Sequence, residues 1–476
     1  MSRYCRLGGT WLFVSLLSTT LFAQEVSPQI EMLRGQAEAA YQDRDFEKAV
    51  ELSDKILNLS NTDHVGLYLK GSGQIEIGIL TRNAELVRQG IANSREAIRH
   101  EGNGKPEYYL PYIYGMSHLS LLEGKKTHAE TGQTVADSVL ERDDLTDEQR
   151  ANIIYQRAQC DVRLRDYPTA VEDLEKALGF KSDHMAAMML KAEVMADYKT
   201  PADAVAAYTD MVKTFPQNPL VYNNRGMYLQ SINRPVDALN DFNKAIQLDN
   251  TFIPAYINRG FAYQEAGDFA NAEIALTQAL NVDPKQPGAL TMRGNARLQL
   301  GKSAEGVADY QQALELTPKN PMSYANLGFG QFFTSDFAGA VGSFKKAMEI
   351  DPKARFLAPW KLAAEIRSRQ YQQVEYQKSI DRPAEQRDWV DSLILFQLGQ
   401  VDATTLLKSV HPDDANARDA QLCEGYYFIG MELVRRNRSQ DAVGYFQQAA
   451  KRELPKLAAY RGAVFALRQA GAQVPQ

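Results

Sequence analysis

The sequence predicts an all-α solenoid, a stack of antiparallel helix pairs that grows by repetition and has no single central core. A period of 34 residues runs without a gap from Ala151 to Ala354. Within each period, two positions are small and one is large and apolar. Proline, asparagine and glycine recur where helices are expected to begin and end. Because the unit repeats, the length of 476 residues is a poor guide to the number of domains.

Six regular repeats are predicted, and they occupy residues 151–354. They begin at Ala151, Met185, Pro219, Ile253, Pro287 and Pro321. The eighth position of each repeat is small: Ala158, Ala192, Gly226, Gly260, Gly294 and Gly328. The twentieth position is also small: Ala170, Ala204, Ala238, Ala272, Gly306 and Ala340. Small residues at both positions allow the two helices of a pair to approach closely.

The twenty-fourth position of each repeat is large instead. Its residues are Leu174, Tyr208, Phe242, Leu276, Tyr310 and Phe344. We expect this side chain to fill the space beside the close contact. The helix boundaries agree with the register, because Asn218 and Asn320 each precede a proline at a first helical position. The residues that follow the second helices include Pro216, Pro284, Pro318 and Pro352.

Over residues 151–354 the chain resembles the tetratricopeptide repeat family, whose unit is 34 residues long. The resemblance implies a right-handed superhelix of antiparallel helix pairs. It also implies a concave groove that is lined mainly by the first helix of each pair. A fold of this kind is expected to act as a protein-binding scaffold.

Upstream of the regular repeats, the chain matches the repeat pattern less closely. Residues 24–150 are predicted to hold degenerate repeats of the same kind, with insertions. One fits residues 30–63. The next begins near His64 and needs about seven extra residues, which we place in its turn. A third covers Tyr108 to Arg142 and is expected to have a slightly long turn.

Downstream of the regular repeats the register breaks. Residues 355–422 are predicted to form an irregular helical segment. Residues 423–476 are predicted to hold one further repeat, with Gly430 at its small position and Phe446 at its large one. A capping helix at about Lys456 to Gln469 is expected to cover the exposed end of the stack, as solenoids require.

The C-terminal part is similar to the NlpI-type periplasmic adaptor lipoproteins and related bacterial repeat proteins. The similarity rests on the stretch from Trp389 to Val401, on Leu406, and on the stretch from Glu424 to Gly430. It implies an adaptor of the bacterial cell envelope that gathers hydrolases or proteases, and it allows a homodimer. This chain departs from that family because it lacks the lipidated cysteine and has more upstream repeats.

Residues 1–23 are predicted to be a secretory signal peptide. Arg3 and Arg6 precede an apolar run over residues 11–22, and cleavage is expected before Gln24. The run is about a dozen residues long, whereas a membrane-spanning helix needs about twenty. We therefore expect an exported protein, periplasmic or secreted, with no stable membrane span after cleavage. A retained membrane anchor is the alternative.

Composition and motifs exclude several classes of function. The net charge of −6 and the absence of a basic tract argue against nucleic acid as a partner. Cys160 and Cys423 lie in distant repeats, so we expect buried thiols and no disulfide. The six histidines show no metal-binding spacing, and no metal or cofactor is predicted. The stretch from Gly294 to Ser303 ends like a phosphate loop, but its glycines are too far apart.

Three functional classes remain. The favoured one is a non-catalytic adaptor that holds proteins or extended peptides in the groove. The second is a structural envelope protein that mainly associates with itself. The third is an enzyme with a site hidden in residues 355–422, and this stretch is too short and too helical to make a convincing catalytic domain. The sequence therefore predicts that the protein is not an enzyme.

The candidate partner-binding residues lie on the first helices. Position 6 is asparagine in three repeats, as Asn224, Asn258 and Asn326. An amide both donates and accepts hydrogen bonds, so a ladder of them can hold the backbone of an extended peptide. The groove candidates beside them are Asn223, Met227, Arg259, Phe261, Asn295 and Phe329. Alternatively, the asparagines bond neighbouring repeats or face water. Phe332 and Phe333 fit either the groove or the core.

A second pattern combines arginine at position 7 with aspartate at position 23. It predicts three structural ion pairs that orient the helices, Arg157–Asp173, Arg225–Asp241 and Arg293–Asp309. In the remaining repeat with arginine at position 7, which begins at Ile253, position 23 is Ala275. Arg259 is therefore the candidate of this group for binding a carboxylate from a partner.

Overall fold

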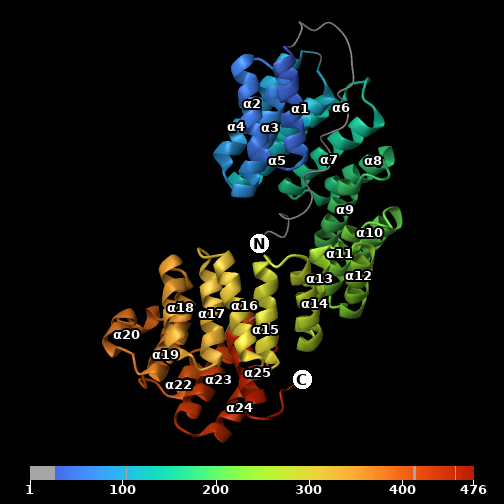
Figure 1. Cartoon of the computed structure of the whole chain (residues 1–476). Helices are drawn as coiled ribbons and strands as arrows, with labels where there is room; N and C mark the ends of the chain where they lie inside the picture. Colours follow the sequence, from blue (N-terminus) through green and yellow to red (C-terminus); the bar gives the residue numbers. More distant parts are fainter. Residues whose placement is uncertain (1–26, 103, 411–413, 456, 476) are drawn as a thin grey trace. The chain divides into compact units, whose positions relative to one another are not determined.

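The computed structural model describes residues 27–102, 104–410, 414–455 and 457–475. Over these residues the protein is all-α, and its helices follow one another largely as antiparallel pairs (Figure 1). The chain divides into two compact units, residues 1–225 and 226–476. The predicted signal peptide lies outside the described residues.

The first unit contains five helix pairs among its described residues. They are α1 (Pro28–Gln42) with α2 (Phe46–Leu59), α3 (His64–Thr81) with α4 (Ala84–Glu101), α5 (Tyr109–Glu123) with α6 (Lys126–Leu140), α7 (Asp147–Leu164) with α8 (Tyr167–Phe180), and α9 (Met185–Tyr198) with α10 (Pro201–Thr214). A short 3-10 helix, η1 (Pro106–Tyr108), precedes α5. The boundary between the units falls inside α11 (Pro219–Ser231).

The second unit continues with the same pairing. Its regular helices are α12 (Pro235–Leu248), α13 (Ile253–Glu265), α14 (Phe269–Val282), α15 (Pro287–Gln299), α16 (Ser303–Leu316), α17 (Pro321–Phe333) and α18 (Phe337–Ile350). The irregular segment holds η2 (Ala354–Leu357), α19 (Ala358–Ser368), α20 (Gln373–Ser379), η3 (Ala384–Gln386), α21 (Trp389–Gln397) and α22 (Ala403–Lys408). The chain then forms α23 (Ala415–Arg435), α24 (Ser439–Ala450) and α25 (Ala458–Gln469).

The predicted repeat register matches the helix boundaries closely. From Met185 to Pro321, each predicted start of a regular repeat is the first residue of a helix. The side chain of Asn218 accepts a hydrogen bond from the backbone N–H of Leu220 at 2.9 Å, and Asn320 does the same for Met322 at 2.9 Å. The first regular repeat differs, because α7 begins at Asp147 after a capping box at Thr146 and not at Ala151.

The small and large positions of a repeat fit into one another. A Cβ atom built on Gly328 lies 2.6 Å from the ring of Phe344, and one on Gly226 lies 2.7 Å from the ring of Phe242. Phe344 and Phe242 are fully buried. Position 24 therefore occupies the space that a side chain at position 8 needs, which confirms the predicted packing rule.

The upstream repeats accommodate their extra residues differently from the prediction. In the second repeat, α3 and α4 are each 18 residues long, and only Arg82 and Asn83 separate them. Arg82 adopts the left-handed conformation with φ +55°, and Asn83 caps α4. In the third, only Gly124 and Lys125 separate α5 from α6. The predictions of long turns are therefore wrong. In the second repeat the extra residues lengthen the two paired helices, and in the third the turn has only two residues.

The irregular segment contributes to the core of the second unit. Trp360 on α19 lies 5.0 Å from Phe329 of α17 and 5.0 Å from Phe428 of α23, measured between ring centroids. Helix α23 begins at Ala415, earlier than the predicted repeat start at Cys423. One continuous cluster of buried side chains joins the last regular repeats to the C-terminal helices.

Candidate functional site

The two helices of the first regular repeat are joined by a two-point ion pair. Nε of Arg157 lies 2.7 Å from Oδ2 of Asp173, and Nη2 lies 2.8 Å from Oδ1. Arg157 also binds Asp137 on α6 at 2.6 Å. This is the arrangement that the pattern at positions 7 and 23 predicts. The arginine is held by two carboxylates of the same chain, so its role is structural.

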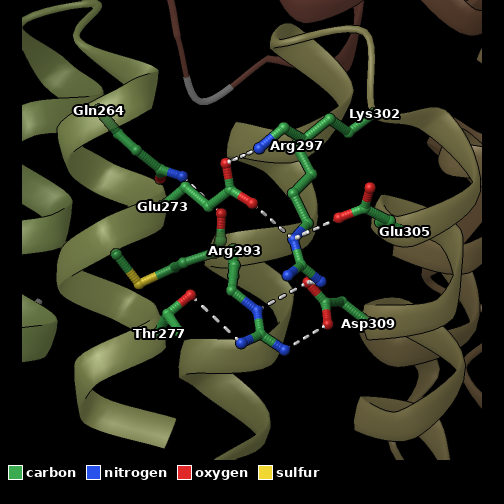
Figure 2. Close-up of polar contacts among 9 residues, drawn as sticks. Gln264, Glu273, Thr277, Arg293, Arg297, Lys302, Glu305 and Asp309 are labelled. Carbon is green, nitrogen blue, oxygen red and sulfur yellow. Dashed lines mark hydrogen bonds and ion pairs between the residues drawn. The ribbon is translucent and has the colours of Figure 1, made fainter.

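A larger charged network surrounds Asp309 (Figure 2). Arg293 donates from Nε to Oδ2 at 3.0 Å and from Nη2 to Oδ1 at 2.7 Å. Arg297 reaches the same Oδ2 at 2.9 Å, and it also binds Glu273 at 3.0 Å. Lys302 binds the second oxygen of Glu273 at 2.6 Å. Ion pairs therefore connect α14, α15 and α16.

The electrostatics of Glu273 follow from this network. Burial on its own raises the pKa of a carboxyl, but hydrogen bonds from Lys302 and Arg297 more than offset it, and the pKa of Glu273 is lowered. The third predicted pair, Arg225–Asp241, joins residues of the two separate units. That pair therefore stays a prediction.

Arg259 lies away from the surface that the sequence assigned to it. It donates hydrogen bonds to the side-chain amides of Asn243 on α12 and Gln278 on α14. Both are second helices, so the guanidinium points between second helices and does not line the first-helix surface. The prediction that Arg259 lines the first-helix groove is therefore corrected. Burial lowers the pKa of Arg259.

Two other groove candidates are buried. Phe329 is 6% exposed, and its ring packs edge-on against Phe344 at 5.2 Å. Asn223 is 1% exposed, and its amide donates to the side chain of Asn224 at 3.4 Å. Both predictions are corrected because neither side chain is accessible to a partner. Phe332 is likewise a core residue.

The remaining candidates keep part of their surface. Met227 on α11 is 47% exposed, and Asn258 and Phe261 on α13 are half-buried. Asn326 on α17 is also half-buried. Asn224 belongs to the first unit, whereas Asn258 and Asn326 belong to the second. A continuous ladder of the three asparagines therefore stays a prediction.

The first-helix surface of α15 and α17 is covered by the C-terminal helix. Gln299 of α15 donates to the carbonyl oxygen of Arg461 at 3.1 Å, and Phe333 of α17 lies 6.2 Å from Phe465 between ring centroids. Helix α25 packs against α23 and α24, as expected of a capping helix. It also contacts α15 and α17. Its sequence is amphipathic, which predicts a buried face but not the surface on which that face packs.

Asn295 belongs to the same covered region. The hydroxyl of Tyr310 donates to its side-chain oxygen at 2.6 Å. The amide therefore already has a partner within its own repeat. The alternative left open by the sequence was a bond to a neighbouring repeat, whereas this bond lies within one repeat.

Three carboxyl groups of the first unit, two of them buried and one half-buried, are absent from the sequence predictions. They are Glu76, Asp161 and Glu193, and burial raises the pKa of each to about 7. Glu76 and Asp161 are 6% and 1% exposed. In the sequence Glu76 stands between two isoleucines, and an acidic residue at such a place is easily read as an exposed position.

The irregular segment forms a cleft of about 670 Å³ between α21, α22 and the start of α23. Trp389, Leu395 and Leu406 contribute its apolar lining, and Arg387 and Asp388 are among its polar residues. The indole N–H of Trp389 donates to Glu424 at 2.6 Å, so its polar edge is already used.

The described residues contain no group of three or more His, Cys, Asp or Glu side chains arranged to hold a metal ion. Cys160 and Cys423 are buried thiols, and burial raises the pKa of each to about 12. None of the helices in the described part of the chain is long and apolar enough to cross a membrane.

Comparison with known protein families identifies the repeats. A family profile described as "TPR repeat" matches residues 294–331. Two profiles described as "Tetratricopeptide repeat" match residues 155–219 and 253–286. The chain contains tetratricopeptide repeats. All three matches lie inside the six repeats that the 34-residue period predicts. Tetratricopeptide repeats typically mediate contacts between proteins, and the matching profiles indicate no enzyme family.

Several known proteins share part of this pattern. The "Heat shock protein sti1 homolog" of Schizosaccharomyces pombe is 28% identical over 109 residues, which is 21% of this chain and 18% of that protein. The crystal structure of PilW, described as a "widely conserved type IV pilus biogenesis factor", is similar at 22% identity with a TM-score of 0.35, over 44% of this chain and 94% of that one. YrrB, described as "a TPR protein with an unusual peptide-binding site", is similar at 16% identity with a TM-score of 0.32, over 38% and 94%.

Proposed function

We propose that this protein is a non-catalytic scaffold of the bacterial cell envelope, which holds other proteins or extended peptide segments on the first helices of its tetratricopeptide repeats. The observation that carries the proposal is the run of helix pairs over residues 151–354, three stretches of which match tetratricopeptide profiles, because this unit typically binds proteins. Each repeat offers the same pair of helices at a regular spacing, so one chain can contact a long partner segment at several points.

The binding surface in the second unit is assigned to α11 and α13. The first-helix surface of α15 and α17 is covered by α25, whereas Met227 on α11 is 47% exposed and Asn258 on α13 is half-buried. An exposed thioether on α11, together with amide and aromatic groups on α13, suits a partner with both apolar side chains and an extended backbone.

An export route supports the envelope location. Residues 1–23 have the charge, apolar run and cleavage site of a signal peptide. The C-terminal resemblance to NlpI-type adaptors suggests hydrolases or proteases of the envelope as partners.

Affinity capture tests the scaffold function. The chain from Gln24 onward is immobilised and exposed to envelope extract, and bound proteins are identified by mass spectrometry. A variant with Asn224, Asn258 and Asn326 all changed to alanine is compared with a control that carries Asn58→Ala and Asn281→Ala. The control residues are exposed asparagines on the second helices α2 and α14. We expect the wild type and the control to retain the same partner, and the triple variant to retain at least tenfold less.

Other outcomes separate the alternatives. Equal retention by the triple variant excludes the asparagines as the binding residues. Capture of nothing except further copies of this chain favours the self-associating structural protein. That alternative has its own support, because Val236 on α12 and Ile274 on α14 are 71% and 56% exposed. Sedimentation at increasing concentration then gives the mass of the assembly.

A further inference from the structure

Helix α25 has two different faces, and both are occupied. Its small and aliphatic face is buried in the core shared with α23 and α24, through Ala459, Ala463, Val464 and Leu467. Arg461, Phe465 and Arg468 follow one another at intervals of four and three residues, so they share the other face of the helix. That face is turned toward α15 and α17. Helix α25 therefore lies between the last repeat and the two regular repeats that contain α15 and α17.

The contact between α25 and α15 is polar and centres on one glutamine. Gln299 donates its side-chain amide to the backbone carbonyl oxygen of Arg461 at 3.1 Å, and the backbone carbonyl oxygen of Gln299 accepts from the guanidinium of Arg468. The guanidinium of Arg468 also lies over the ring of Phe269, 5.0 Å from its centroid. Nothing in this contact is covalent, and a few hydrogen bonds hold the end of the chain to α15.

The contact with α17 depends on a residue without a side chain. A Cβ atom on Gly462 lies 2.7 Å from the ring of Phe333 and 2.7 Å from the ring of Tyr427. Real Cβ atoms do not approach other heavy atoms so closely. Glycine is therefore what allows α25 to sit between two aromatic rings.

The docked helix is not an optimal fit to this surface. Oε1 of Gln299 is buried and has no hydrogen-bond partner among the described residues. Burial lowers the pKa of both Arg461 and Arg468, so the docked position disfavours their charged forms. An unsatisfied acceptor and desolvated cations both reduce the free energy gained on docking.

We propose that the surface of α15 and α17 is a helix-binding site and that α25 is its displaceable occupant within the same chain. The partner recognised there is an amphipathic helix that carries a glycine between two arginines, as Gly462 stands between Arg461 and Arg468. The proposal rests on the scaffold function. It adds a second binding surface, which α25 covers, to the one on α11 and α13. Release of α25 opens Gln299 and Phe333 to a partner helix of this kind.

The full-length chain allows a direct test with a helix of known sequence. A fluorescein-labelled peptide of residues 457–472 is titrated against the wild type, Gly462→Leu and Gly444→Leu, and binding is measured by fluorescence anisotropy. In Gly462→Leu the resident helix clashes with Phe333 and Tyr427, whereas the added peptide retains its glycine. Gly444 lies on the neighbouring α24 and has nothing within 4 Å of its Cβ position, so it provides the matched control.

We expect Gly462→Leu to bind the peptide at least tenfold more tightly than the wild type and Gly444→Leu. A peptide that itself carries Gly462→Leu is expected not to bind. Equal affinity of the three chains for the wild-type peptide overturns the proposal, provided that circular dichroism shows their helix content to be unchanged. The probe is the chain's own helix, so this result does not depend on whether envelope capture finds a partner.

A second measurement covers the case in which Gly462→Leu fails to fold. Amide hydrogen exchange of the wild type is compared between α25 and its neighbours α23 and α24. A displaceable helix exchanges at least tenfold faster than the helices on which it packs, because it opens without the rest of the unit. Equal exchange rates in the three helices show that α25 opens only with the whole unit, and they overturn the proposal.

Discussion

Arg157 and Asp173 connect the two helices of one repeat through parallel contacts of 2.7 and 2.8 Å, and Arg157 extends to Asp137 of the preceding pair at 2.6 Å. The Asp173 side chain is 2% exposed, so the guanidinium replaces most of its contact with water. A single arginine thereby fixes α6, α7 and α8. The same geometry recurs at Arg293 and Asp309, so it belongs to the repeat and not to one local site.

Asp309→Asn is expected to destabilise the second unit strongly. Two arginines, Arg293 and Arg297, share this carboxylate, whose side chain is 3% exposed, and the substitution leaves both without their shared counter-charge. Breaking a buried pair in this way costs on the order of 3 kcal/mol. Glu349→Gln is the control, because its pair with Lys346 is exposed on both sides and is expected to contribute about 0.5 kcal/mol. Urea unfolding measures both, and similar losses in the two variants contradict the prediction.

Ala275→Asp is expected to supply the carboxylate that Arg259 lacks at position 23. Arg259 now binds two neutral amides, and its Nε is buried with no hydrogen-bond partner among the described residues. An aspartate at this position can accept from Nε as Asp309 does from Arg293. We expect the free energy of unfolding to rise by about 1 kcal/mol relative to Ala275→Asn, which has the same shape without the charge. A lower urea midpoint for the aspartate variant than for the asparagine variant excludes the missing-partner interpretation.

Local rules in the sequence predicted the repeats well. The 34-residue period, the fit of Gly328 against Phe344 and the pairing of Arg157 with Asp173 all depend on residues in the same or adjacent helices. Such contacts repeat with the sequence, so each repeat provides an independent check of the others. Helix starts at prolines were predictable for the same reason.

The surface roles were much less predictable. Phe329 and Met227 occupy the same position in their repeats, yet Phe329 is 6% exposed and Met227 is 47% exposed. The difference arises because Trp360 of the irregular segment packs on Phe329. That contact, like the one between Gln299 and Arg461, joins parts of the chain that no periodicity relates. The periodicity of a helix therefore does not show which of its faces is covered by a segment that is distant in the sequence.

Gly328→Ala is expected to destabilise the protein although alanine is the better helix former. The added methyl group lies 2.6 Å from the ring of Phe344, so either the ring or the paired helices must move. Overpacking of this kind costs about 1–3 kcal/mol. Gly342→Ala in the same repeat is the matched control, since nothing lies within 4 Å of its Cβ position. The control is expected to gain about 0.5–1 kcal/mol from helix propensity. Opposite shifts of the thermal midpoint are therefore predicted, and shifts of the same sign contradict the packing rule.

Glu76→Gln is expected to stabilise the first unit at pH 8 and to have little effect near pH 4. Burial raises the pKa of Glu76 from 4.5 to about 7, and Arg44 only partly opposes the shift. Below pH 4.5 the carboxyl is protonated in both states, so folding carries no penalty for its charge. Between pH 4.5 and 7 the folded state binds the proton more tightly than the unfolded chain, and stability falls as the pH rises. Above pH 7 the penalty is complete.

Glutamine lacks this titration, so the advantage of Glu76→Gln over the wild type is expected to grow across that window to on the order of 1–3 kcal/mol. Glu130→Gln, at an exposed position on α6, serves as the control and is expected to show little change with pH. Urea unfolding at a series of pH values between 4 and 8 measures the difference between each variant and the wild type. A constant difference for Glu76→Gln at every pH shows that the carboxyl ionises at the same pH in the folded and unfolded chains.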